Sequence, residues 1–246
     1  MHRSAVFLTA LTLCASLSMA AAAAEPYQQY GDVPSADLNF LNKSGDGSRE
    51  LRRSEDKAYD VEVWDTEAKK PMSSITGLSG VVNVANISPD GTKVVTAERT
   101  GIVGLWDAAT GKEIRLLRGH EDQIQDARFS PDGKTIASGA RDGTARTWNV
   151  ETGKQIAVHQ QQGGSYIDAV SFSPDGKWVM SAGNGWLEIW NATTGDVHSS
   201  TKIGSEDDGA YSTDARFSPD GRAILVMNDE GKVADTIPLM MPLPRN

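Results

Sequence analysis

Short stretches of alternating apolar and polar residues, separated by turn residues, fill the chain between Gly119 and Lys154. The stretch Ile124–Phe129 alternates clearly and runs into Ser130–Gly133, in which Pro fixes φ and Gly permits a positive φ, as a tight hairpin requires. The pattern predicts four strands joined by tight turns, with few residues left for helices. The predicted strands are Ile124–Phe129, Lys134–Gly139, Thr144–Trp148 and Lys154–His159.

The same pattern recurs along the chain. Four tryptophans are spaced 42 residues apart, at Trp64, Trp106, Trp148 and Trp190. The sequence Ser-Pro-Asp-Gly precedes the last three of them and occurs once more downstream, at Ser88–Gly91, Ser130–Gly133, Ser173–Gly176 and Ser218–Gly221. A period in the low forties predicts a series of stacked four-stranded sheets.

The unit that ends at Trp148 resembles the WD-repeat family of β-propellers. Gly119-His120 matches the Gly-His pair of that family, and Trp148-Asn149 stands where Trp-Asp is usual. The resemblance implies a hydrogen-bonded structural tetrad formed by His120, Ser138, Asp142 and Trp148. Its chemistry is reasonable, because a buried Asp needs donors and the His, Ser and indole groups can supply a chain of them.

The other copies depart from this pattern. In the copy ending at Trp106, Thr96 replaces the Ser, but Leu78 and Thr100 occupy the His and Asp positions, which predicts a broken tetrad. The copy ending at Trp190 keeps Ser181 and has glycines in place of Gly-His. The last copy has Thr236 at the Trp position, and a degraded first copy includes Leu38–Leu41, Ser44–Gly47 and Ser54–Lys57.

These units predict an all-β fold, a β-propeller of about five four-stranded blades over residues 36–246. The units end near Trp64, Trp106, Trp148, Trp190 and Thr236. Five units form either a small closed ring or an arc completed by a partner, and an arc would favour self-association through unpaired strand edges. The prolines of Ile237–Asn246 predict that the last unit lacks its own fourth strand, and the extension 25–35, through Pro26–Tyr30, is a candidate to close the ring.

The first 24 residues have a short basic start, an apolar stretch and a run of alanines, which is typical of a secretory signal peptide. The apolar stretch is shorter than the roughly 20 residues of a membrane span, so no membrane insertion is expected after cleavage. The cysteine, Cys14, lies inside this leader, and the mature chain therefore has no thiol or disulfide chemistry. We expect a periplasmic or secreted bacterial protein.

The charge and the motifs of the chain limit the kinds of partner and site that it can have. Loss of Arg3 with the leader leaves 23 basic against 33 acidic residues, a formal charge near −10, which argues against nucleic acid as a partner. His159 and His198 occur at different offsets in their units, so no metal site is expected, and no catalytic or phosphate-binding motif predicts an enzyme or a cofactor. The acidic loop Glu206–Asp208 is either a solvated loop or a cation site.

The remaining candidate function is binding through the surface of the protein. The resemblance places the loops before the first strands and the turns between second and third strands at one end, where WD-repeat proteins commonly bind protein partners. Aromatic and Arg side chains favour such contacts, so we predict that Arg99, Arg141, Tyr166 and Tyr211 bind a protein or peptide. The predicted function is a non-catalytic interaction scaffold; the alternative is small-ligand or carbohydrate recognition in pockets between blades, with Trp178 and Trp186 as stacking surfaces.

Overall fold

The structure is a computed structural model that describes residues 40–41, 43–54, 60–164, 166–203, 214–227 and 233–239. The chain divides by its contacts into Met1–Val33 and Pro34–Asn246, and all described residues lie in the second unit. The predicted leader 1–24, the extension 25–35, the acidic loop Glu206–Asp208 and Tyr211 lie outside the described residues.

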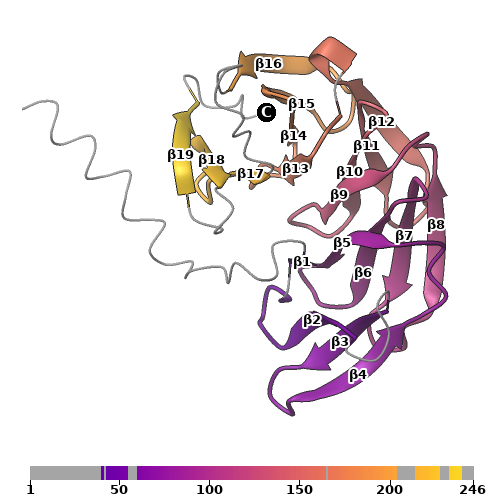
Figure 1. Cartoon of the computed structure of the whole chain (residues 1–246). Coiled ribbons are helices and arrows are strands. Elements are labelled where there is room, and N and C mark those ends of the chain that lie inside the picture. Colours follow the sequence, from indigo (N-terminus) through magenta and orange to yellow (C-terminus); the bar gives the residue numbers. More distant parts are fainter. Residues whose placement is uncertain are drawn as a thin grey trace, which may run out of the picture. The chain divides into compact units, whose positions relative to one another are not determined.

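Three consecutive antiparallel sheets of the expected kind occupy the middle of the chain (Figure 1). In each sheet the strands pair in chain order, as the repeat pattern predicts. The first contains β5 (Val82–Ile87), β6 (Lys93–Glu98), β7 (Ile102–Asp107) and β8 (Glu113–Arg118). The second contains β9 (Ile124–Phe129), β10 (Thr135–Ala140), β11 (Thr144–Asn149) and β12 (Gln155–Gln160). The third contains β13 (Ala169–Phe172), β14 (Trp178–Gly183), β15 (Trp186–Asn191) and β16 (Val197–Lys202).

Sheets of three described strands flank these three. The first contains β2 (Arg49–Arg53), β3 (Val61–Asp65) and β4 (Lys70–Ile75), and the last contains β17 (Asp214–Phe217), β18 (Ala223–Met227) and β19 (Val233–Pro238). The short strand β1 (Phe40–Leu41) pairs in parallel with β5, so it joins the sheet of the next unit rather than that of its own. One 3-10 turn, η3 (Gln162–Gly164), precedes β13.

A turn of the same construction recurs in every unit, between the first and second strands where both are described. In the turn at Ser130, the hydroxyl donates to Asp132 at 2.6 Å and accepts the amide of Thr135 at 3.0 Å. The turns at Ser88, Ser173 and Ser218 repeat both contacts. The degraded copy at Ser44 does so as well, and its hydrogen bonds from Ser44 and Ser48 lower the pKa of Asp46 to about 2. Local hydrogen bonding between side chains and the backbone therefore fixes the conformation of these five turns.

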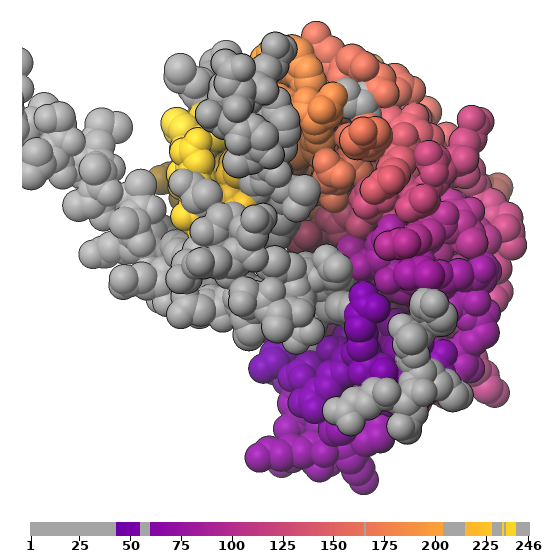
Figure 2. Space-filling view, viewed as in Figure 1, coloured from indigo at the N-terminus to yellow at the C-terminus, as the bar shows by residue number. Residues whose placement is uncertain are grey.

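The hydrophobic core lies between the sheets. Four clusters of buried side chains each join one sheet to the next, so each sheet is packed on its neighbour in chain order, and the colours from indigo to orange abut in the space-filling view (Figure 2). Polar side chains also reach across these interfaces: Ser73 donates to the Ala108 carbonyl at 2.7 Å, and Thr147 donates to the Ala192 carbonyl at 2.8 Å. The interfaces are thus fixed in register as well as buried.

Candidate interaction surface at the loop end of the sheets

The loops that precede first strands and the turns that join second to third strands lie at one end of the sheets, here called the loop end. Backbone hydrogen bonds tie them together: the Arg99 amide donates to Val81, Arg141 to Gln123 and Asp168 to Ala182, each at 2.9 Å. The Ser-Pro-Asp-Gly turns lie at the other ends of the strands, here called the turn end. The loop end is the surface that the sequence predicts for partner contacts.

In the β9–β12 sheet, the structure brings the four predicted tetrad residues together. The Trp148 indole donates to Ser138 Oγ at 2.8 Å, and Ser138 Oγ lies 2.8 Å from His120 Nε2. His120 Nδ1 lies 2.9 Å from Asp142 Oδ2, which also accepts the amide of Glu121 at 2.9 Å. The chain of bonds therefore connects the buried indole to the loop that begins the sheet.

The charge of Asp142 is strongly stabilised. Burial by itself raises the pKa of this carboxyl, but hydrogen bonds from His120, Thr144 and the Glu121 amide more than offset that effect and hold the pKa far below its usual range. Asp142 is therefore ionised at neutral pH and receives donors from both the turn and the loop.

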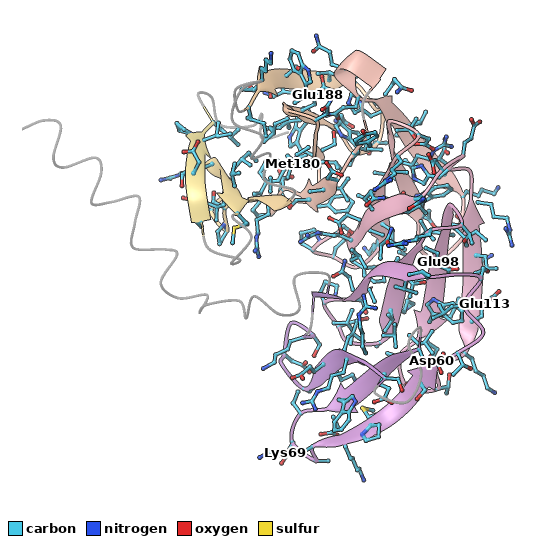
Figure 3. All side chains as sticks on the ribbon, viewed as in Figure 1. Asp60, Lys69, Glu98, Glu113, Met180 and Glu188 are labelled. Atoms are coloured by element: carbon cyan, nitrogen blue, oxygen red, sulfur yellow. The ribbon has the colours of Figure 1, made fainter. Side chains whose placement is uncertain are left out.

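The β5–β8 sheet lacks the His and Asp of the tetrad and uses another acid in their place. Trp106 donates to Thr96 at 2.9 Å, and Thr96 contacts Glu98 at 3.4 Å. Glu98, at the end of β6 and fully buried (labelled in Figure 3), accepts the amide of Ser79 at 2.9 Å. Burial raises the pKa of Glu98, and its hydrogen bonds only partly counter that shift. One carboxylate from the second strand thus replaces both the His and the Asp.

The β13–β16 sheet uses a third arrangement. Trp190 donates to Ser181 at 3.3 Å and Ser181 donates to Gln161 at 2.8 Å, so Gln161 takes the place that His120 has in the preceding sheet. The adjacent amide of Gln162 donates at 3.1 Å to Glu188, which lies on β15 and is labelled in Figure 3.

Glu188 also reaches the preceding sheet. Its Oε2 lies 2.8 Å from Nε2 of His159 on β12, and both side chains are only 4% exposed. The His159 ring stacks on Trp190 with ring centroids 5.3 Å apart. The pair therefore couples the loop before β13 to the interface between two sheets.

One rule covers the three sheets. In each sheet a carboxylate accepts a loop amide. The carboxylate lies on the second strand for the Ser79 amide, in the second turn for the Glu121 amide and on the third strand for the Gln162 amide. A search by motif position finds Asp142 and misses the other two. The available signal for Glu98 is an acidic residue at the end of the second strand, where the next copy has Ala140.

Two of the four predicted contact residues lie together on the loop end. The Arg141 guanidinium carbon lies 5.8 Å from the centroid of the Tyr166 ring, and Tyr166 is 53% exposed. The backbone on the C-terminal side of Tyr166 is bound to two sheets, because the Ile167 amide donates to Ala140 at 3.0 Å and the Asp168 amide to Ala182 at 2.9 Å. The site therefore presents an exposed aromatic ring on a fixed loop.

The remaining predicted contacts do not join this pair within the described residues. Arg99 is exposed and donates through Nε to Asn83 at 3.0 Å in the neighbouring β5–β8 sheet. Tyr211 lies outside the described residues. The candidate surface is therefore defined here by Arg141, Tyr166 and the adjoining Asp168.

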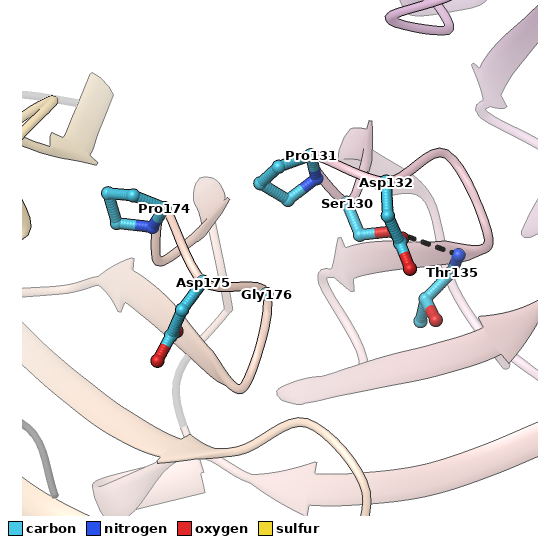
Figure 4. Close-up of a pocket in the computed structure, with 7 residues that line it drawn as sticks. All are labelled: Ser130, Pro131, Asp132, Thr135, Pro174, Asp175 and Gly176. Carbon is cyan, nitrogen blue, oxygen red and sulfur yellow. Dashed lines mark hydrogen bonds between the residues drawn. The ribbon is translucent and has the colours of Figure 1, made fainter. Parts of the chain in front are cut away.

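A cleft of about 320 Å³ lies at the turn end, between two successive Ser-Pro-Asp-Gly turns (Figure 4). Its lining is formed by Ser130, Pro131, Asp132, Thr135, Pro174, Asp175 and Gly176. The tryptophans of the alternative prediction do not line it. Trp178 instead packs on the cluster between the last two sheets, with its ring 4.9 Å from that of His198. Trp186 is partly buried, and its carbonyl accepts Gln161 Nε2 at 3.2 Å.

No group of three or more His, Cys, Asp or Glu side chains among the described residues is arranged to hold a metal ion. No helix in the described part of the chain is long and apolar enough to span a membrane.

The fold and the loop-end networks define a class: a repeat protein built of stacked four-stranded antiparallel sheets of the WD40 propeller kind. Residues 111–149 and 153–191 match the family described as "WD domain, G-beta repeat", so the chain carries WD40 repeats and the resemblance seen in the sequence is confirmed. Such repeats generally form protein-interaction scaffolds.

Among solved structures, the C-terminal WD40 domain of Sif2 is similar in fold, with a TM-score of 0.62 and 19% sequence identity. The match covers 77% of this chain and 55% of that one, so the chain spans about half of that structure's length. At this identity the similarity concerns the fold alone. The search of curated proteins gave no match.

Proposed function

We propose that the protein is a non-catalytic, exported WD-repeat scaffold that binds a protein or peptide partner through the loop end. The observation that carries this proposal is Tyr166, which is 53% exposed although the backbone on its C-terminal side is hydrogen-bonded to two sheets. A fixed, exposed aromatic ring loses little conformational entropy on binding, and Arg141 beside it adds a second residue type enriched at interface centres.

Export is supported by the composition of residues 1–24, with its basic start, apolar stretch and terminal alanines. Under this proposal the scaffold works in the periplasm or outside a bacterial cell, and its partner is an envelope or secreted protein. Mass spectrometry of the N-terminus of the exported chain tests this point, with a mature start near Glu25 as the expected result.

The binding surface is tested by replacing Arg141 with Gln and Tyr166 with Ala together. Both side chains are exposed, so we expect a melting temperature within about 2 °C of the wild type, because surface substitutions change stability by roughly 0.5 kcal/mol or less. Partner capture from envelope extract should fall sharply. A matched control changes Lys154→Gln and Ile156→Ala, both exposed and away from the loop end; equal capture by the two double variants would contradict the proposal.

A further inference from the structure

Asp168 differs from the other carboxylates that are buried in the β5–β16 region. Asp126, Asp142, Glu98 and Glu188 each accept a main-chain amide. The side chain of Asp168 makes no hydrogen bond or ion pair with a described residue, although it is only partly exposed. Burial raises the pKa of Asp168, and the charge of Arg141 counters this only in part. This carboxylate is therefore not used to hold the fold, and a donor from outside would relieve its desolvation.

Tyr166 provides a second element of a receptor. The Arg141 guanidinium lies 5.8 Å from its ring centroid, which shows that a cation can occupy the neighbourhood of this ring. That guanidinium is exposed and makes no hydrogen bond or ion pair with another described residue. Arg141 can therefore move aside at the cost of only its contact with the Tyr166 ring and its attraction to Asp168.

The loop is built to hold these two groups in place. A Cβ atom added to Gly183 would lie 1.9 Å from the Tyr166 carbonyl oxygen, so the loop rests directly on a strand that has no side chain there. The Asp168 amide is bound to Ala182 at 2.9 Å. Tyr166 and Asp168 therefore keep a fixed spacing that a partner can match.

We propose that Tyr166 and Asp168 form a receptor for a lysine or arginine side chain of the protein partner, and that Arg141 occupies this place in the free protein and contacts the partner beside it in the complex. The inference rests on the proposed function of the loop end. A cationic partner fits the whole chain, whose formal net charge is −9, and the ring and carboxylate supply the two interactions that an ammonium or guanidinium group uses. An anionic partner would meet Arg141 favourably but would face the Asp168 charge.

The test measures binding of two labelled decapeptides, one alternating lysine and glycine and the other alternating glutamate and glycine, by fluorescence anisotropy at fixed ionic strength. Asp168→Asn and Tyr166→Ala should each weaken binding of the lysine peptide roughly two- to fivefold. Arg141→Gln should strengthen it, because the variant removes the competing cation. The sign of this last effect is the sharpest readout.

Matched controls make the same charge changes at the turn between β11 and β12. Glu151→Gln and Lys154→Gln alter exposed residues whose side chains make no described contact. They report the effect of net charge alone, so the loop-end variants must exceed them. Equal effects of Asp168→Asn and Glu151→Gln would overturn the inference, as would weaker lysine-peptide binding by Arg141→Gln.

The two proposals fail in distinguishable ways. If the Arg141 and Tyr166 double variant loses its partner but Asp168→Asn captures that partner as the wild type does, the loop end binds protein and the cation receptor is wrong. If neither the double variant nor Asp168→Asn changes partner capture or peptide binding, the loop end is not the binding surface and both proposals fall.

Discussion

Asp142 and Glu98 accept equivalent loop amides, from Glu121 and Ser79, yet the pKa values of the two carboxyls are shifted in opposite directions. Hydrogen bonds from two side chains and two amides outweigh burial at Asp142 and lower its pKa. At Glu98 burial outweighs the hydrogen bonds and raises the pKa. The same contact should therefore make opposite contributions to the pH dependence of stability.

For Asp142→Asn we expect a loss of about 1–3 kcal/mol in the free energy of unfolding at pH 7, because the amide is a weaker acceptor for donors that stay in place. A lowered pKa gives stability that is present above the ordinary value of 3.8 and lost as the pH falls. The difference between variant and wild type should therefore shrink at acid pH. Urea unfolding followed by circular dichroism at several pH values measures it, and a difference independent of pH would contradict the assignment.

For Glu98→Gln the sign is reversed. A raised pKa means that the folded wild type binds a proton more tightly than the unfolded chain, so its stability falls as the pH rises from 4.5 through the raised value. Gln does not titrate and can still accept the Ser79 amide through its carbonyl oxygen. The variant should gain stability relative to the wild type over this pH range in the same unfolding assay. A gain that appears only on acidification would refute it.

The sequence predicts the role of a residue well only where that residue stands at a position of the family motif. His120, Ser138, Asp142 and Trp148 stand at family positions and are indeed hydrogen-bonded to one another. Gln161 contacts the Ser181 hydroxyl as His120 contacts Ser138, although Gln161 does not align with any position of the tetrad. Spacing along the chain does not report the reach of a longer side chain, and that is why the substitutes escaped prediction.

At the scale of elements, strand positions follow closely from the turn residues. The predicted Lys134–Gly139 is observed as Thr135–Ala140, one residue later, because Gly and Pro mark where each hairpin must turn. Pairing partners are less predictable when a segment is short. The two residues of β1 contain too little alternation to specify a partner, and the structure pairs them with β5 of the next unit.

The close contact between the Tyr166 loop and Gly183 gives a prediction at this scale. Gly183→Ala would place a methyl group 1.9 Å from a backbone carbonyl, whereas Gly139→Ala would meet the Ile167 side chain at 2.5 Å. Overpacking costs about 1–3 kcal/mol, and a backbone cannot turn away as a side chain can. We expect Gly183→Ala to be the more destabilising change in thermal unfolding and to shift the Tyr166 resonances in NMR spectra. A more severe effect of Gly139→Ala would contradict this account of the loop.

Across the whole molecule, cohesion comes from four interfaces between successive sheets. Each cluster of buried side chains belongs to two neighbouring units, so an inner sheet is stabilised from both sides. In such an array stability is close to a sum of unit and neighbour terms. The repeated tryptophans and turns made this plan predictable, whereas the contacts of the first and last units could not be derived from copies that had drifted so far.

Hydrogen exchange tests this plan. We expect the slowest amide exchange in β9, β10 and β11, in the central sheet, and faster exchange in β3 and β18 of the three-stranded sheets. Mass spectrometry of peptic peptides after graded labelling gives the order directly. Uniform protection from β3 to β18 would indicate one cooperative unit without the expected gradient.

The carboxylate that binds the loop amide comes from a different element in each sheet, so one repeat cannot simply replace another. If the second turn of the β9–β12 sheet, with Asp142, were grafted into the β13–β16 sheet, two acids would compete for the Gln162 amide, because Glu188 is already there. The reverse graft would leave the Glu121 amide without an acceptor. Anyone shuffling these units, in the laboratory or through gene rearrangement, must transfer a loop together with the acid that binds it.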